Sequence, residues 1–223
     1  MMLARERVKR FFLDILFPRI CIACKKYLAE EDRLLCGVCF ASVPVRTAVF
    51  REAGMPVASA TTYASLPALR LVHALKYERM LEAASVMERI ITAHVRGASF
   101  ELEEAVLIPV PLHPARLRTR GFNQAEAIAE ALAATHHCRI EKKALIRTRN
   151  TGVQARTGPR AERYENVRRC FRTDPGRMPS LKTANVVLID DVYTTGATMR
   201  EAAKALRRSG VRKIQALVFA RTE

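Results

Sequence analysis

The stretch Val186-Val187-Leu188-Ile189-Asp190-Asp191-Val192-Tyr193-Thr194-Thr195-Gly196-Ala197-Thr198 joins an apolar run to an acidic pair and then to small residues. The apolar run predicts a buried central strand. Such a strand brings Asp190 and Asp191 to the carboxyl edge of a parallel sheet, where ligands bind in this class of fold. The small residues that follow let backbone N–H groups approach an anion at the start of a helix. The stretch therefore predicts a strand, a phosphate-binding loop and a helix.

Two carboxylates beside a phosphate loop suit the vicinal hydroxyls of a ribose, which they can hold directly or through a divalent ion. The combination predicts a site for a 5-phosphorylated sugar, formed by Asp190, Asp191 and the residues from Thr194 to Thr198. By periodicity alone, the stretch also fits any α/β strand that ends in an acidic helix-capping turn.

Strands and helices alternate on both sides of this stretch, as hydrophobic periodicity and Gly or Pro stops indicate. The alternation predicts a doubly wound α/β domain with a mainly parallel sheet. The predicted strands are Val57–Tyr63, Ala105–Val110, Ala144–Arg147, Asn185–Asp191 and Val211–Ala220, and the predicted helices are Pro67–Arg79, Leu81–Arg96, Phe122–Ala134 and Thr198–Ser209.

A second run, Ile108-Pro109-Val110-Pro111-Leu112-His113-Pro114-Ala115-Arg116-Leu117-Arg118-Thr119-Arg120-Gly121-Phe122-Asn123-Gln124, leads from a strand into a predicted loop with three arginines. Guanidinium groups bind pyrophosphate in a bidentate manner, so Arg116, Arg118 and Arg120 are candidate diphosphate ligands. The alternative is a solvated basic turn. His113 remains open between a structural and a catalytic role.

Four cysteines near the N-terminus have the spacing Cys21-x2-Cys24 and Cys36-x2-Cys39, with eleven residues between the pairs. Two such pairs supply the four thiolates of a closed, structural zinc site, and so small a segment needs the metal to fold. The alternatives are two unrelated buried cysteine pairs or a redox C-x-x-C. The other two cysteines, Cys138 and Cys170, are expected to be buried thiols.

The chain has 223 residues with 38 Lys and Arg against 22 Asp and Glu, a net charge of +16, which predicts affinity for polyanions. No apolar run is long enough for a transmembrane span, and no export signal is present, so a cytoplasmic location is expected. Residues 1–18 predict an amphipathic helix that packs on the protein, with a membrane surface as the alternative.

Residues 116–172 concentrate positive charge, with fourteen Lys and Arg against five Asp and Glu. This excess suggests a track for a nucleic-acid backbone, with Phe122, Tyr164 or Phe171 as stacking platforms. The alternative is a solvated basic face.

The thirteen residues from Val186 to Thr198 resemble the 5-phosphoribosyl-1-pyrophosphate (PRPP) signature of the type I phosphoribosyltransferases. Together with the cysteine pairs, His73-Ala74-Leu75-Lys76-Tyr77, the Pro109–Gln124 run and Gln154…Arg163-x-x-Asn166, the chain resembles the ComF family over nearly its whole length. The resemblance implies an N-terminal zinc ribbon over residues 19–45 and a type I phosphoribosyltransferase fold over residues 57–223.

The resemblance also implies residue roles. Arg116, Arg118, Arg120 and Gly121 would lie in the pyrophosphate loop, and Lys76 and Tyr77 beside the site. A mobile loop from Thr148 to Asn166 would cover it, with Gln154, Arg163 and Asn166 as contacts. The segment Thr157-Gly158-Pro159 departs from the family pattern, in which Leu and Ser usually follow the Gln.

Two functions follow as hypotheses. The first is an enzyme that binds Mg2+ and PRPP and transfers the phosphoribosyl group to an acceptor that the sequence does not identify. It would act in DNA uptake for natural transformation, with DNA-uptake proteins as candidate partners. The second is a non-catalytic single-stranded DNA-binding protein whose phosphoribosyl site holds a nucleic-acid phosphate or senses PRPP.

Overall fold

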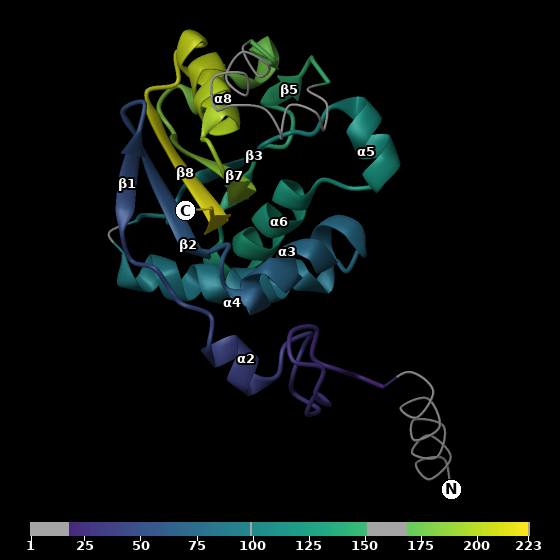
Figure 1. Ribbon diagram of the computed structural model, residues 1–223. Coiled ribbons are helices and arrows are strands. Elements are labelled where there is room, and N and C mark those ends of the chain that lie inside the picture. The colour runs from purple at the N-terminus through teal and green to yellow at the C-terminus, as the bar shows by residue number, and fades with distance from the viewer. Residues whose placement is uncertain (1–17, 99, 151–168, 223) are drawn as a thin grey trace, which may run out of the picture.

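The computed structural model describes residues 18–98, 100–150 and 169–222, which form an α/β domain with an N-terminal cysteine ribbon (Figure 1). A six-stranded sheet has the order β1-β2-β8-β7-β3-β4, in which only β1 runs antiparallel to its neighbour. The strands are β1 (Val49–Glu52), β2 (Met55–Thr62), β3 (Val106–Pro109), β4 (Arg139–Ile140), β7 (Asn185–Tyr193) and β8 (Lys213–Arg221). The predicted mainly parallel α/β architecture is confirmed.

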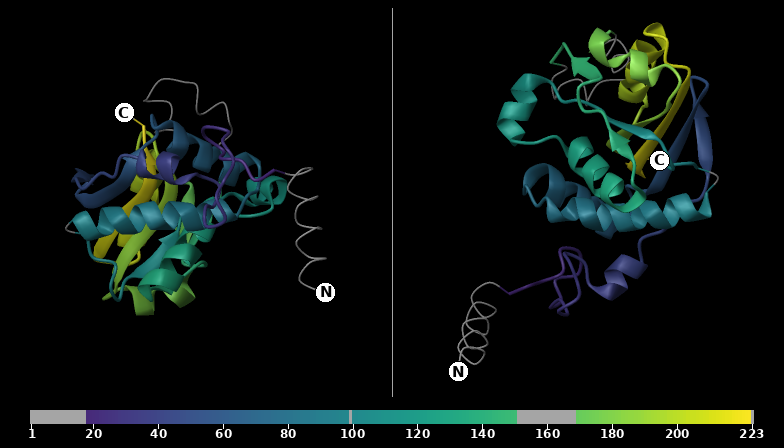
Figure 2. Two further views of the ribbon diagram at one scale, coloured as in Figure 1. Left: turned by 90° about the horizontal axis from the view of Figure 1, so that it is seen from below. Right: turned by 180° about the vertical axis from the view of Figure 1, so that it is seen from behind.

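Helices cover both faces of this sheet (Figures 1 and 2). Alternate residues of β7 point to opposite faces: Val187 and Ile189 belong to one apolar core, and Val186 and Leu188 to the other. The first core also contains residues of α3 (Leu66–Tyr77), α4 (Glu82–Gly97) and α6 (Gln124–His136). The second contains residues of α8 (Ala197–Arg208) and of a small antiparallel sheet, β5 (Leu145–Arg147) with β6 (Phe171–Thr173).

The predicted arginine loop is wrong, because residues Pro114–Arg120 form a short helix, α5. Local sequence explains the helix. Pro114 occupies its first turn, the His113 side chain accepts a hydrogen bond from the Ala115 N–H, and Gly121 ends it with a φ of 84°. His113 therefore has a structural role, as the N-cap of α5. The following helix starts at Gln124 rather than Phe122, since Asn123 caps it.

Other elements differ from the prediction in their pairing. The predicted strand at residues 144–147 exists as β5. Among the described residues it pairs only with β6, a strand that the sequence did not predict, and it lies outside the main sheet. Strand β1 was also not predicted. It forms a hairpin with β2 through Ala53 and Gly54, both with positive φ, as tight hairpin turns require. Two 3-10 turns, η2 (Pro175–Arg177) and η3 (Pro179–Leu181), precede β7.

The cysteine ribbon, which includes the short helix α2 (Gly37–Ala41), packs beside α4. Leu34, Leu35 and Val43 belong to the same buried core as α4. The guanidinium of Arg89 lies 4.4 Å from the centre of the Phe40 ring. The amphipathic helix predicted for residues 1–18 lies outside the described residues, apart from Pro18. Among the described residues, no helix combines the length and apolarity needed to cross a membrane.

Candidate functional site: a polar cavity at the carboxyl edge of the sheet

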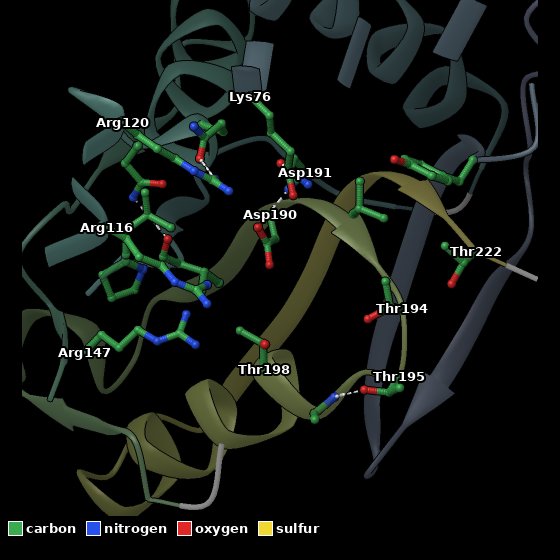
Figure 3. A pocket seen from close by; sticks show the side chains of 18 of the residues that line it. Lys76, Arg116, Arg120, Arg147, Asp190, Asp191, Thr194, Thr195, Thr198 and Thr222 are labelled. Atoms are coloured by element: carbon green, nitrogen blue, oxygen red, sulfur yellow. Dashed lines mark hydrogen bonds and ion pairs between the residues drawn. The ribbon is translucent and has the colours of Figure 1, made fainter. Parts of the chain in front are cut away.

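A cavity of about 290 Å³ lies where β3 and β7 end at their carboxyl edge. Figure 3 shows Arg116, Arg120 and Arg147 on one side of it, Thr194, Thr195 and Thr222 on the other, and Asp190 and Asp191 between. Most of the lining is polar: Tyr63, Lys76, Tyr77, Arg116, Arg120, Asn123, Gln124, Arg147, Asp190, Asp191, Thr194, Thr195, Thr198 and Thr222.

Strand β7 delivers the acidic pair. Asp191 forms an ion pair with Lys76 of α3, with 2.8 Å between Oδ2 and Nζ, and both side chains are largely buried. The Oδ1 atom of Asp190 accepts a hydrogen bond of 2.9 Å from the Asp191 N–H. Burial and the neighbouring Asp191 charge raise the pKa of Asp190 to about 7, although Lys76 acts in the opposite direction. The site therefore holds one carboxylate in a direct ion pair with lysine, Asp191, and one whose pKa is raised, Asp190.

The loop after β7 brings the N-terminus of α8 to the cavity. Thr194, Thr195, Ala197 and Thr198 line it. Gly196 adopts a φ of 74° directly before the helix, a conformation that favours glycine. A Cβ atom on Gly196 would lie 2.6 Å from Cζ of Tyr193, so the loop also requires glycine for space. This end of the cavity combines hydroxyl donors with the positive end of a helix dipole.

The opposite wall is formed by α5 and its neighbours. Arg116 and Arg120 are four residues apart on the helix, so they share a face, and both line the cavity. Arg118 lies on the other side of the helix and is exposed, and Gly121 ends the helix without lining the cavity. The structure thus brings together two of the three predicted arginines.

The structure places Lys76 and Tyr77 at the cavity, as the resemblance implied. Gln154, Arg163 and Asn166 lie outside the described residues. Sequence reasoning missed Tyr63, Gln124 and Arg147 as lining residues, because the tertiary structure rather than a local sequence pattern brings them to the cavity. The one usable signal was that Tyr63 ends a predicted parallel strand at the ligand-binding edge.

The four cysteine sulfurs of the ribbon, from Cys21, Cys24, Cys36 and Cys39, lie within 4.8 Å of one another. Tetrahedral zinc with Zn–S bonds of about 2.3 Å requires sulfur atoms about 3.8 Å apart, and Cys24 and Cys36 have 3.7 Å between their Sγ atoms. The donor set therefore fits a closed structural zinc site. Cys138 and Cys170 are buried away from this cluster, as predicted.

The acidic pair lies at a parallel-sheet edge, between the N-terminus of α8 and an arginine wall formed by Arg116, Arg120 and Arg147. This arrangement fits a protein of the phosphoribosyltransferase type. Residues 117–223 match the phosphoribosyl transferase domain family, and residues 12–66 match the double zinc ribbon domain family. The chain belongs to the ComF/YhgH family, in which a double zinc ribbon precedes a phosphoribosyltransferase domain.

Three relatives illustrate this membership. The chain is 29% identical to the DNA utilization protein YhgH of Escherichia coli O6:H1, over 92% of this chain and 98% of that protein. It is 30% identical to competence protein F of Haemophilus influenzae, over 68% of this chain and 66% of that protein. It is 38% identical to competence protein ComFC of Bacillus subtilis, over 47% of this chain and 39% of that protein.

Proposed function

We propose that the cavity binds a 5-phosphoribosyl ligand, with PRPP as the substrate and Mg2+ as its companion ion. The observation that supports this most directly is the order of groups along the cavity: a helix N-terminus, then the acidic pair, then the arginine wall. PRPP has the same order of chemical groups, with a 5-phosphate, a ribose with two free hydroxyls and a diphosphate.

In this proposal Thr194, Thr195 and Thr198 hold the 5-phosphate together with the N-terminus of α8. Asp190 and Asp191 accept hydrogen bonds from the ribose hydroxyls. Lys76 orients Asp191 through their 2.8 Å ion pair. Arg116 and Arg120 bind the diphosphate, and the magnesium ion, when bound, neutralises part of the negative charge of that group.

Transfer would need little from the protein beyond positioning and charge stabilisation. The bond between ribose C1 and the diphosphate oxygen breaks, and its electron pair leaves with the diphosphate. The acceptor forms the new bond to C1 and gives up a proton. No side chain has to act as a nucleophile, and the arginine wall stabilises the departing charge.

The test is calorimetric titration of zinc-loaded protein with PRPP in Mg2+, followed by measurement of diphosphate release with nucleobases and nucleic acids as acceptors. We expect saturable binding to one site per chain, weakened at least about tenfold in Arg116→Ala. Binding without diphosphate release from any acceptor would favour a PRPP sensor over an enzyme. No binding by folded protein would overturn the proposal.

A second candidate function, binding of single-stranded DNA, is supported by the outward face of α8. Arg200, Lys204, Arg207 and Arg208 fall within about 100° of one another around this helix. The last three, with Arg169 and Glu201, line a shallow depression on this face. Four cations against one carboxylate there suit nucleic-acid phosphates, and the names of the E. coli relatives refer to DNA utilization.

Salt-dependent binding of a single-stranded oligonucleotide tests this candidate. If Lys204 and Arg208 each contact one phosphate, replacing both with alanine lowers the slope of log affinity against log salt by about 1.4. Replacing Arg118 and Arg177 with alanine removes the same charge elsewhere and serves as the control. Equal slopes for the two double variants would argue against this surface.

A further inference from the structure

The side chain of Glu52 binds both flanks of the loop between β7 and α8, residues 194–196. At the end of β7, the Tyr193 hydroxyl donates a 2.7 Å hydrogen bond to Oε2 of Glu52. In the first turn of α8, Nε of Arg200 donates a 3.0 Å hydrogen bond to Oε1 of Glu52, and the two side chains form an ion pair. One carboxylate of the edge strand β1 therefore bridges the residues before and after this loop.

The bridge lies largely out of solvent. Tyr193 is buried, and the side chains of Glu52 and Arg200 are only 17% and 25% exposed. Charge-assisted hydrogen bonds are stronger than neutral ones, and partly buried ion pairs are screened less by salt than exposed ones. The Phe50 ring also packs edge-to-face on the Tyr193 ring, with 5.2 Å between the ring centres. These contacts hold the Tyr193 ring in one position.

The Tyr193 ring supports the loop from outside the cavity. A Cβ atom on Gly196 would lie 2.6 Å from Cζ of Tyr193, so the ring packs directly on the Gly196 backbone. The residues on both sides of Gly196 line the cavity, whereas Gly196 and Tyr193 do not. From the other flank, the Arg200 N–H donates a 2.9 Å hydrogen bond to the Gly196 carbonyl. Glu52 therefore acts on Gly196 by two routes.

We propose that Glu52 is a positioning residue, which holds Tyr193 and Arg200 so that the β7–α8 loop keeps the conformation that binds the 5-phosphate of the ligand. This inference rests on the proposed function and adds to it a residue that does not line the cavity. A loop binds a phosphate well only when its N–H groups point to one place. If the loop without Glu52 has this conformation about a tenth of the time, the affinity falls about tenfold.

Two variants test the bridge, and a third is the control. Glu52→Ala removes the bridge completely. Tyr193→Phe keeps the ring against Gly196 and removes only the hydroxyl, so it tests the inference even if Glu52→Ala fails to fold. Arg51→Ala is the matched control, because Arg51 precedes Glu52 on β1 but donates its 3.2 Å hydrogen bond within the hairpin, to the Gly54 carbonyl.

The experiment is calorimetric titration of full-length, zinc-loaded protein with PRPP in Mg2+, followed by competition titrations with ribose 5-phosphate and with inorganic diphosphate. We expect Glu52→Ala to lose about tenfold in affinity for PRPP and for ribose 5-phosphate, but less than about twofold for diphosphate. Arg116→Ala should show the opposite pattern for the two competitors, since Arg116 belongs to the arginine wall at the other end of the cavity. Arg51→Ala should stay within about twofold of the wild-type affinity for all three ligands.

Tyr193→Phe should lose about threefold in affinity for PRPP, as expected for one hydrogen bond. Added to Glu52→Ala, it should cost nothing further, because its hydroxyl acts only through Glu52. A merely structural role of Glu52 would not produce this combination of non-additive losses and a selective effect on the 5-phosphate. Thermal melting identifies any variant that fails to fold.

Wild-type affinity for PRPP in folded Glu52→Ala would overturn the inference while leaving the proposed function intact. Wild-type affinity in Tyr193→Phe would do the same if Glu52→Ala does not fold. Equal losses for ribose 5-phosphate and diphosphate in Glu52→Ala, or an equal loss in Arg51→Ala, would also overturn it, because they indicate general damage to the domain. No PRPP binding by the wild-type protein would overturn the proposed function together with the inference.

Discussion

At the scale of single residues, the arginines of α5 show why local structure changes the meaning of a sequence pattern. Three arginines at alternate positions would all be available in a flexible loop. On a helix, residues two apart lie on opposite sides, so Arg116 and Arg120 reach the cavity and Arg118 does not. Arg116 and Arg120 therefore lie in the cavity wall, whereas Arg118 is exposed to solvent.

This difference gives a direct prediction for the arginines. Arg120→Ala should weaken PRPP binding at least about tenfold, because a charge-assisted hydrogen bond to the diphosphate is lost. Arg118→Ala should stay within about twofold of the wild-type affinity, since its side chain is solvated. Calorimetric titration checks both variants, and equal losses would show that net charge rather than geometry sets the affinity.

Asp190 predicts a pH-dependent stability. Its pKa is raised to about 7, mainly by burial and then by Asp191, above the value of 3.8 expected for an exposed carboxyl. The folded protein therefore holds a proton that the unfolded chain loses, and stability falls as the pH rises from about 4 to about 7. Asp190→Asn removes this penalty and should stabilise the ligand-free protein at pH 8 by about 1–3 kcal/mol.

Thermal unfolding at pH 4.5 and pH 8, without Mg2+, measures this effect. The advantage of Asp190→Asn should shrink toward the acidic pH, where the wild-type carboxyl is protonated in the folded state and partly protonated in the unfolded chain. A variant that is less stable than the wild-type protein at pH 8 would contradict the raised pKa of Asp190.

At the scale of elements, the turn between β7 and α8 depends on Gly196 for two separable reasons. The positive φ costs about 1 kcal/mol for a residue with a Cβ atom. The contact with Tyr193 adds a steric cost, because the Tyr193 hydroxyl donates a 2.7 Å hydrogen bond to Glu52 of β1 and the ring has little freedom to move.

We therefore expect Gly196→Ala to destabilise the protein by about 2–4 kcal/mol. Gly54→Ala is the matched control, since Gly54 has a similar φ of 76° but open space around its Cα. It should cost only about 1 kcal/mol. Chemical denaturation measures the free energy of unfolding of both variants. Equal losses would show that the Tyr193 ring moves to make room for the added methyl group.

The elements also show how far the sequence predicts this fold. The run from Val186 to Thr198 contains its own strand, acidic pair and helix start, so a local pattern sufficed for β7 and α8. Helix α5 was missed because its caps, rather than any apolar periodicity, form it. Gln124 and Arg147 lie far from Asp190 in the sequence, and only the tertiary structure brings all three to the same cavity.

At the scale of the whole molecule, the cysteine ribbon is joined to the larger domain through contacts with α4. Arg33 forms a 3.1 Å ion pair with Glu82, and Phe40 packs under Arg89. Leu34 and Leu35 belong to the core that α4 also fills. Loss of the metal would therefore affect the surface of the larger domain as well as the ribbon.

Cys36→Ala should abolish binding of one zinc ion per chain and lower the melting temperature of the protein, because the ribbon cannot fold by apolar burial alone. Cys138→Ser, outside the four-cysteine cluster, should retain the full zinc content. Elemental analysis with thermal melting checks both variants. Retention of a full equivalent of zinc by Cys36→Ala would contradict the four-thiolate site.

We propose above that the carboxyl edge of the sheet holds a phosphoribosyl group with a diphosphate. Calorimetric titration of zinc-loaded wild-type protein with PRPP in Mg2+ is the decisive measurement. We expect saturable binding to one site per chain, strongly weakened in Arg116→Ala and unchanged in Arg118→Ala. A folded wild-type protein that takes up no PRPP, or an Arg116→Ala variant that binds it as well as the wild-type protein, would rule out this site.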